Sequence, residues 1–479
     1  MNEREGKPAA LWAPFAWLAA HEAIGQGQGM ARDVLCEIGS DGRWSRIDVG
    51  VPAAVASQRG ALNVGRALLP GVVDAHSHAF QRAFAGLAER REHEHDDFWS
   101  WRDRMYRVAL AVEPQALRAI AAALYVELLR GGYTQVCEFH YVQHDRAGRA
   151  WSDPLTMSWM LAEAAADAGI GLTMLPVLYE RAGFESPALR DDQRRFATDA
   201  PWVLNAERRV NEFARQHRAA PLNAGVAIHS LRAATPESIA RVVAAAQGPL
   251  HIHVAEQTAE VEDCLRATGR RPVEWLLAQH RLDARWQLVH ATHVTDAEID
   301  GVAASGACAV ICPSTEANLG DGLTDVPRWL ARGTALAIGS DSHVTRDWRE
   351  ELRLLEYGQR LARRARNLAA APSEGLPATA ERLFARIQQG SAAAAGEASW
   401  GLRVGARADA VLADSDDETL GGMPAARTLD ALVFSSPARP FRDVMVAGRW
   451  VIRDGMHADE TRIRREFADA MRALWADGV

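Results

Sequence analysis

Two histidines two residues apart, His76 and His78, follow a strongly apolar run in this chain. Because successive side chains of a strand alternate between its two faces, residues two apart point the same way. At the end of a buried strand, the two imidazoles would converge on one point and form half of a metal site. A lone His-x-His is weak evidence by itself, so the remaining ligands must come from the ends of other strands.

Further metal-ligating side chains lie at the ends of later apolar runs. They are Glu138, His140, His229, His251, His253, His290, His293, Cys312, Asp341 and His343. A catalytic zinc takes about three nitrogen or oxygen ligands and leaves a position for water. We predict His76, His78, His253 and Asp341 as ligands of one divalent metal ion. Zinc is the expected metal, although iron and nickel suit such donors too.

A single metal is favoured because a second ion needs a bridging carboxylate, often a modified lysine, and the run over 225–232 contains no lysine. Glu256, three residues beyond His253, can reach the water and pass its proton to a leaving group. The alternative is a charge at the start of the following helix. His290 would add a second imidazole, and Asp341 would stay ionised near a cation. We predict Glu256, His290 and Asp341 as catalytic, and His251 and His293 as packing or supporting residues.

The elements that must position these residues alternate between strand-like and helix-like patterns. Strands are expected over 67–78, 134–140, 172–178, 224–229, 250–254, 287–291, 307–312 and 336–340. Helices are expected over 114–130, 154–168, 236–246, 259–268 and 296–304. This pattern predicts an α/β fold, a (β/α)8 TIM barrel over 67–399, with its active site at the carboxyl ends of the strands.

Both flanks of the barrel are rich in short β-like runs and turns. We expect 1–66, including an early strand within 9–20, and 400–479 to form one small β-sandwich domain from both termini, with a terminal helix. The segment 180–221 is longer than an ordinary crossover. It is expected to contain a helix over 205–217 and a loop over 184–201 that covers the mouth of the barrel.

Composition excludes several functional classes. The 479 residues carry 54 basic and 62 acidic side chains, and this net charge of −8 argues against a nucleic-acid or membrane-surface role. No stretch is long and apolar enough to span a bilayer. Five scattered cysteines, Cys308 and Cys312 among them, do not suit a disulfide framework and indicate a reducing, cytoplasmic location.

The combined motifs resemble the amidohydrolase superfamily, specifically its mononuclear aminohydrolase branch. The superfamily pattern consists of His-x-His, His-x-x-Glu, a later His and Ser-Asp. The longer segments 76–89, 98–102, 138–142, 253–257 and 339–343 resemble the formimidoylglutamate deiminases, and the resemblance extends over 67–350. It implies hydrolysis of N-formimino-L-glutamate to N-formyl-L-glutamate and ammonia in histidine degradation. It also implies a homodimer.

The substrate implied by this resemblance carries two carboxylates and a cationic formimino group. Its site needs fixed cations, and arginine is the preferred partner of a carboxylate. Taken singly, Arg102 and Arg232 could equally be surface salt-bridge residues, and we expect Arg82 and Arg104 to be structural. The predicted substrate-binding residues are Gln81, Arg102, Tyr141, His229 and Arg232.

In the expected reaction Asp341 accepts a proton from water, His290 stabilises developing charge, and Glu256 delivers a proton to the departing nitrogen. One alternative is an aminohydrolase of a purine, pyrimidine, triazine or guanidino compound, which would need stacking aromatics in place of paired arginines. A second alternative, of another class, is a non-catalytic scaffold that retains the barrel. Glu256, His290 and Asp341 disfavour it, because a scaffold has no reason to hold them together.

Overall fold

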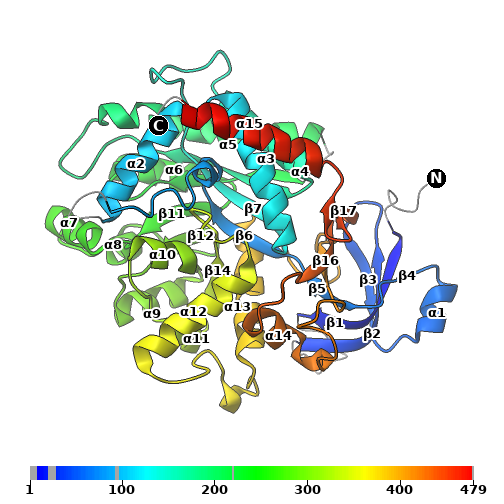
Figure 1. Cartoon of the computed structure of the whole chain (residues 1–479). Helices are drawn as coiled ribbons and strands as arrows, with labels where there is room; N and C mark the ends of the chain where they lie inside the picture. Colours follow the sequence, from blue (N-terminus) through cyan, green and yellow to red (C-terminus); the bar gives the residue numbers. More distant parts are fainter. Residues whose placement is uncertain (1–7, 20–28, 92–96, 218–220, 477–479) are drawn as a thin grey trace.

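A closed barrel of parallel strands forms the larger part of the molecule (Figure 1). The computed structural model describes residues 8–19, 29–91, 97–217 and 221–476. Pairing of β14 with β6 and of β10 with β8 closes the ring. The barrel strands are β6 (Val72–Ser77), β7 (Tyr133–His140), β8 (Gly171–Leu178), β9 (Leu222–Ala224) continued by β10 (Val226–Ile228), β11 (Leu250–Val254), β12 (Trp286–His290), β13 (Cys308–Ile311) and β14 (Ala335–Ile338).

Helices surround this ring, and the predicted (β/α)8 architecture is confirmed. The barrel strands form near-continuous apolar runs because they are covered on both faces; every residue of β6, β7, β8 and β11 is buried. Proline begins several helices, where its missing N–H costs nothing. The helices are α2 (Phe98–Ala111), α3 (Pro114–Arg130), α4 (Thr156–Ala168), α5 (Ala200–Gln216), α6 (Pro236–Ala245), α7 (Thr258–Thr268), α8 (Pro272–Gln279), α9 (Asp296–Ser305), α10 (Pro313–Leu319), α11 (Val326–Ala331), α12 (Trp348–Arg363) and α13 (Thr379–Ala394).

The single strand expected over 67–78 is wrong, because two strands in two different sheets occupy it. β5 (Ala67–Pro70) pairs with strands of the terminal sheet, and β6 begins the barrel. Gly71 lies between them, where an added Cβ would stand 2.1 Å from Thr134 Oγ1. Only glycine fits this close crossing. Since β6 and most of β5 are buried, the apolar run does not reveal the break.

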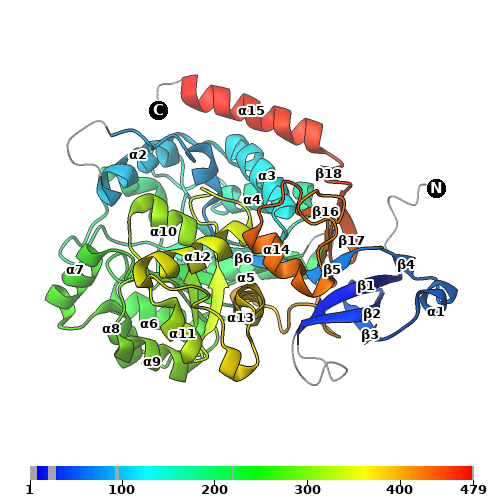
Figure 2. The same cartoon turned by 60° about the horizontal axis from the view of Figure 1, so that its bottom comes forward.

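Strands from both ends of the chain form one further sheet beside the barrel (Figure 2). Its hydrogen-bonded order is a single path, β18-β17-β16-β15-β5-β1-β2-β3, with β4 on β1. A bridge between Arg43 and Arg407 brings the start of β3 to the segment before β15. The strands are β1 (Ala10–Leu18), β2 (Gly29–Ile38), β3 (Trp44–Asp48), β4 (Leu62–Asn63), β15 (Ala410–Ala413), β16 (Phe441–Val446), β17 (Arg449–Arg453) and β18 (Met456–His457).

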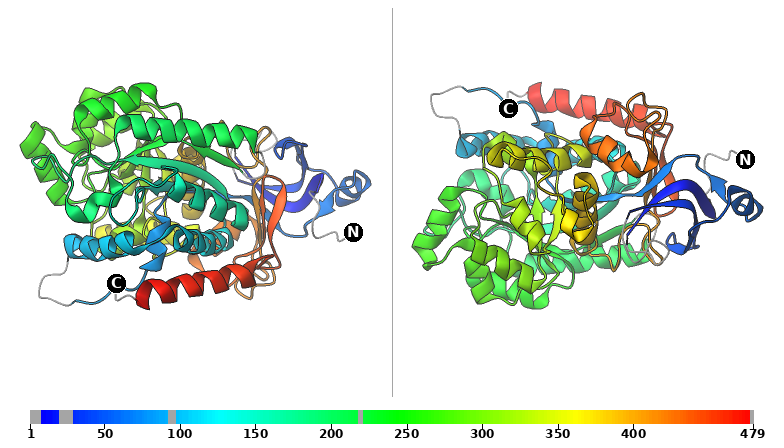
Figure 3. Two further views of the ribbon diagram at one scale, coloured as in Figure 1. Left: turned by 90° about the horizontal axis from the view of Figure 1, so that it is seen from above. Right: turned by 90° about the horizontal axis from the view of Figure 1, so that it is seen from below.

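A buried arginine before β15 joins this sheet to the barrel. Arg407 binds Asp409 through two nitrogens and also donates to Gln135 Oε1 of β7 at 2.7 Å. Helix α1 (Ala53–Gln58) lies at the outer end of the sheet, and α14 (Thr428–Phe434) lies between the sheet and the barrel helices (Figures 1 and 2). The expected terminal helix is α15 (Glu460–Ala476), which lies along the outside of α3 (Figure 3).

Within the long segment that begins at residue 180, the described part around 191–196 packs against the barrel mouth. The segment contains a 3-10 turn (Asp191–Phe196) and α5, which begins five residues before the expected 205. The Phe196 ring lies 5.1 Å from that of Tyr141, and Gln193 donates to Tyr179 Oη at 2.9 Å. Among the described residues, no single helix is long and apolar enough to cross a membrane; α2 and α3 pass that test only jointly, across a bend of 119°.

One buried carboxyl group anchors a helix of the barrel mouth and makes stability depend on pH. Glu351 of α12 accepts hydrogen bonds from the backbone nitrogen and Oγ of Ser314 at the start of α10, at 2.9 and 2.6 Å. Burial raises the pKa of Glu351 well above its ordinary value. The folded protein therefore holds a proton that the unfolded chain releases above pH ~4.3.

We predict that the Glu351 contribution makes the free energy of unfolding fall as pH rises from 5 to 8. Glu351→Gln should make this fall shallower, by at most about 1.4 kcal/mol per pH unit. Urea denaturation followed by circular dichroism measures it, with the exposed neighbour in Glu350→Gln as control. Equal pH slopes for Glu351→Gln and the parent would contradict the prediction.

Candidate active site

Four side chains from three strand ends converge at the mouth of the barrel. His76 Nε2 lies 3.0 Å from His253 Nε2 and 3.1 Å from His78 Nε2. Asp341 Oδ1 lies 3.5 Å from His76 Nε2 and 3.4 Å from His78 Nε2. Ligands about 2.1 Å from a central ion in a tetrahedron lie about 3.4 Å from one another. The donors of His76, His78 and Asp341 therefore have the spacing of ligands to one divalent metal ion, and His253 adjoins them through His76, in a group of donors that also includes His290.

The seam between β6 and β14 positions Asp341 beside the two histidines of the first motif. Asp341 N donates to His76 O at 2.9 Å, and His343 Nε2 donates to His78 O at 3.0 Å. Ser340 binds both oxygens of buried Asp74, through N at 2.8 Å and Oγ at 2.6 Å. These bonds hold the loop after β14 directly against the strand that carries the histidines.

Strained backbone conformations gather at the same end of the barrel. Positive φ angles occur at Ala255 (53°), His290 (69°), Ala291 (45°), Asp341 (48°) and His343 (64°). Left-handed conformations of non-glycine residues cost about 1–3 kcal/mol each and persist where surrounding contacts enforce them. The chain thus uses strained turns to aim side chains at the barrel mouth.

The histidines of this cluster are held in the form that binds metal. Burial lowers the pKa of His76 to about 3, and it lowers the pKa of His78 and His253 as well. His78 donates its Nδ1 hydrogen to Phe139 O at 2.9 Å, which leaves the Nε2 lone pair facing the cluster. Neutral imidazole is the ligating form.

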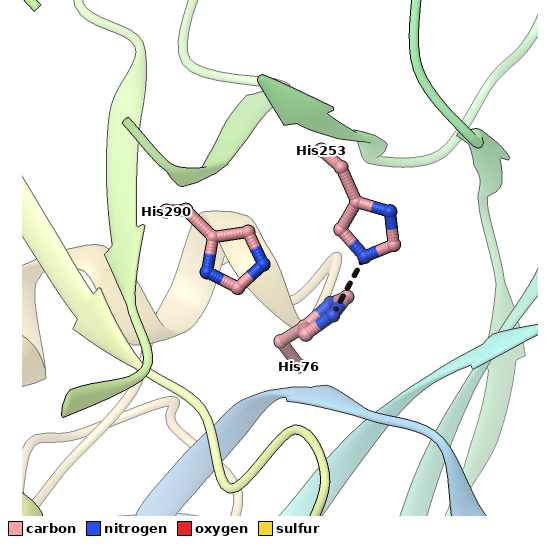
Figure 4. Close-up of side chains that lie close together, drawn as sticks. All are labelled: His76, His253 and His290. Carbon is pink, nitrogen blue, oxygen red and sulfur yellow. Dashed lines mark hydrogen bonds between the residues drawn. The ribbon is translucent and has the colours of Figure 1, made fainter. Parts of the chain in front are cut away.

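His290, at the end of β12, faces His76 and His253 (Figure 4), and three carboxylates lie near its ring. Its Nε2 lies 3.7 Å from Glu256 Oε1 and 3.8 Å from Asp341 Oδ2, and its Nδ1 lies 3.3 Å from Glu316 Oε1. Burial alone would lower its pKa, but the carboxylates of Glu256, Glu316 and Asp341 raise it to about 10. Burial raises the pKa of Glu256 to about 7. This arrangement can hold and move protons.

Two arginines enter the same pocket, a cavity of about 50 Å³. The Arg102 and Arg232 guanidinium carbons lie 4.5 and 5.7 Å from the centre of the Trp99 ring. Within the described part of the chain, Arg232 has no hydrogen bond or ion pair, and Arg102 contacts Asp103 at 3.4 Å. The pocket therefore contains two cations that form no hydrogen bond to a carboxylate of the pocket itself, although the nearby Glu260 and Glu256 raise the pKa of Arg232 against the effect of burial.

The other predicted substrate-binding residues line this cavity too. Gln81 Nε2 donates to Tyr141 Oη at 3.0 Å. The His229 ring lies 5.8 Å from the Tyr141 ring and 5.2 Å from the His253 ring. All eleven residues that the sequence predicts as ligands, catalytic groups or substrate contacts are thus brought to one end of the barrel.

Sequence reasoning missed one wall of the pocket. Four residues of α2 that were not predicted line it together with the predicted Arg102 at helical spacing: Phe98, Trp101, Met105 and Tyr106. Positions i, i+3, i+4, i+7 and i+8 share one face of a helix, so this periodicity was the available signal. Thr315, Glu316 and Leu319 of α10 were also missed, although they follow a strand end as the predicted residues do.

Several histidines and arginines of the motifs have structural contacts instead. His251 Nε2 donates to Ala394 O at 3.1 Å, and His293 Nε2 donates to Asp321 O at 2.8 Å. Arg82 binds Glu127 through two nitrogens, and Arg104 donates to Ala88 O. The supporting roles expected for these four residues agree with their contacts. Glu138, His140, Cys308 and Cys312 are buried.

Three comparisons relate the chain to known proteins. Residues 67–451 match the model of the Amidohydrolase family. A formimidoylglutamate deiminase of Pseudomonas aeruginosa is 46% identical over 454 residues, which cover 93% of this chain and 97% of that protein. A crystal structure of an amidohydrolase from Brucella melitensis superposes with a TM-score of 0.88 at 40% identity, covering 97% of this chain and 99% of that one.

A more distant structure has the same fold. An adenosine deaminase from Xanthomonas campestris, crystallised with bound zinc, superposes with a TM-score of 0.74 at 20% identity, covering 97% of this chain and 98% of that one. At this identity the likeness concerns the fold alone.

We predict that the purified protein binds one divalent metal ion and that His253→Ala lowers its occupancy. Loss of one ligand should weaken metal binding by about 10-fold or more. Metal content after dialysis against a metal-buffered solution measures it. The control is His251→Gln on the same strand, which keeps a donor for Ala394 O. Equal metal content in His253→Ala and the parent would contradict the ligand set.

Proposed function

Because the chain belongs to the amidohydrolase family, we propose that it hydrolyses N-formimino-L-glutamate to N-formyl-L-glutamate and ammonia. The observation that carries this proposal is the pair of arginines, Arg102 and Arg232, in the cavity that also contains the candidate ligands. The Pseudomonas aeruginosa relative supports the same substrate. Water supplies the oxygen of the formyl group, and the terminal formimino nitrogen leaves as ammonia.

The charges of the pocket give this substrate one orientation. Its two carboxylates suit Arg102 and Arg232, since guanidinium groups bind carboxylates through paired hydrogen bonds. Its cationic formimino end then points toward the acidic side of the cavity, at Glu256 and Asp341. Gln81 and Tyr141, already hydrogen-bonded to each other, offer polar atoms between the two ends.

Proton transfer and charge stabilisation are the roles of three buried residues, namely Asp341 of the ligand cluster and its neighbours Glu256 and His290. A divalent ion held by His76, His78, His253 and Asp341 would polarise water and lower its pKa. Asp341 accepts a proton from the attacking water, and Glu256 delivers a proton to the departing nitrogen. His290 stabilises negative charge as it develops, with Glu316 holding its Nδ1 so that Nε2 faces the reacting atoms.

The two alternative functions account for fewer of these features. A neutral purine or triazine gains little from two guanidinium groups, and burying a charge without a partner is costly. A non-catalytic scaffold gives no reason for His290 to lie within 4 Å of Glu256, Glu316 and Asp341.

The proposal also covers the metal, the pathway, the location, the oligomeric state and the small domain. We infer that the resident metal is a single zinc ion and that the enzyme acts in histidine degradation in the cytoplasm, as a homodimer. We also infer that the terminal sheet forms a small β-sandwich, supported by the bridge that folds β3 toward β15 and by a separate apolar core between these strands.

We predict that Arg102→Met and Arg232→Met each raise the KM for N-formimino-L-glutamate by about 30-fold or more. The reason is that each variant loses charge-assisted hydrogen bonds worth roughly 2–4 kcal/mol. Initial rates of ammonia release measure the effect, and Arg104→Met on the same helix serves as control. If both variants kept the parental KM, the dicarboxylate assignment would be wrong.

We also predict that Glu256→Gln lowers kcat by about 100-fold to 10,000-fold while it retains the metal. The amide keeps the size of the side chain but cannot carry the proton, and general acid–base catalysis contributes effects of this size. Single-turnover ammonia release and metal content are measured on the same sample. An unchanged kcat would remove Glu256 from the proton path.

A further inference from the structure

A second group of metal-ligating side chains lies next to the candidate ligand cluster. Glu256, His290 and Asp321 each present one donor atom, and these atoms lie within 4.8 Å of one another. All three residues are buried, with exposed fractions of 7%, 1% and 4%. The set contains none of the four residues assigned to the resident metal.

Asp321 supplies the observation that points to a ligand. Its Oδ2 is buried and has no hydrogen-bond partner in the described part of the chain. A buried carboxylate oxygen without a donor is costly, and a bound cation would remove that cost. Burial and the neighbouring Glu256 raise the pKa of Asp321 to about 9. Two acidic groups so close therefore compete for one proton when no cation is present.

The loop that carries Asp321 is fixed from three sides. Gln257 donates to Asp321 Oδ1, His293 Nε2 donates to Asp321 O at 2.8 Å, and Asp321 N donates to Glu316 O at 2.9 Å. The carboxylate is thus held in place before any ion arrives. Gln257 directly follows Glu256 in the chain. The same backbone turn therefore positions Glu256 itself and, through the Gln257 side chain, Asp321.

We propose that Glu256, His290 and Asp321 form a second, inhibitory site for a transition-metal cation such as zinc. Two carboxylates and an imidazole are donors that zinc accepts, whereas magnesium and calcium prefer sites made of oxygen alone. The inhibitory effect rests on the proposed function. An ion bound at this site would be ligated by a Glu256 oxygen and by His290 Nε2. These are the groups that the proposed reaction needs for proton transfer and charge stabilisation. Excess zinc would therefore stop turnover without displacing the resident metal.

The test uses the full-length protein loaded with one equivalent of metal. Zinc chloride is added over a range of buffered free concentrations, and bound zinc and the rate of ammonia release are both measured. We expect the parent to bind a second equivalent and to lose activity over the same range. Magnesium chloride should do neither.

Asp321→Asn keeps the acceptor for Gln257 but removes the ligand. It should weaken binding of the second equivalent by about 10-fold or more. Glu262→Gln, an exposed acid on α7, is the matched control and should bind zinc as the parent does. Equal second-site binding by Asp321→Asn, or no second equivalent in the parent, would overturn the proposal.

A crystal of the parent soaked in zinc gives a result that does not depend on the variant. Anomalous density between Glu256, His290 and Asp321 supports the site, and density only at the four-ligand cluster overturns it. If the one-equivalent protein released no ammonia from N-formimino-L-glutamate, the proposed reaction would fail, whereas zinc stoichiometry and the anomalous map would still decide the second site.

Discussion

The hydrogen-bonded seam between β6 and β14 is the contact on which the site depends, because it closes the barrel and brings three of the four candidate ligands together. His78 N donates to Asp341 O at 3.3 Å, and Asp341 N donates to His76 O at 2.9 Å. The first and last strands of the ring are far apart in sequence, so barrel closure is also what assembles the ligands. The strained backbone of Asp341 is held by the same hydrogen bonds.

The charges of the pocket follow from its construction. Cationic side chains reach the cavity from α2 and from the segment after β10, whereas carboxylates come from the ends of β11 and β14. The cavity therefore has a basic side and an acidic side, with the ligand cluster next to the acidic one. A substrate with two carboxylates at one end and a cationic C=N group at the other matches this polarity. The crowded carboxylates also make a site for a second cation physically reasonable.

Much of the site was predictable because its residues follow strand ends, where local pattern and barrel topology fix the position. His76, His78 and His253 could be placed from the two-residue period of a strand and the carboxyl-end rule for barrels. The break at Gly71 was not predictable, since both flanking strands are apolar and the constraint is a close contact with Thr134. Asp321 was missed for a similar reason: its place beside Glu256 depends on hydrogen bonds from Gln257 and His293, which are remote in sequence.

We propose that one cavity joins a metal-ligand cluster to a basic subsite selective for a dicarboxylate. A side-by-side comparison of kcat/KM for ammonia release tests it most directly, using the metal-loaded enzyme with N-formimino-L-glutamate, its analogue N-formiminoglycine, and a set of purines and guanidino acids. We expect N-formimino-L-glutamate to be preferred over the one-carboxylate analogue by about 30-fold or more, with little turnover of the heterocycles. Equal turnover of the two formimino compounds, or faster turnover of a purine, would contradict the account.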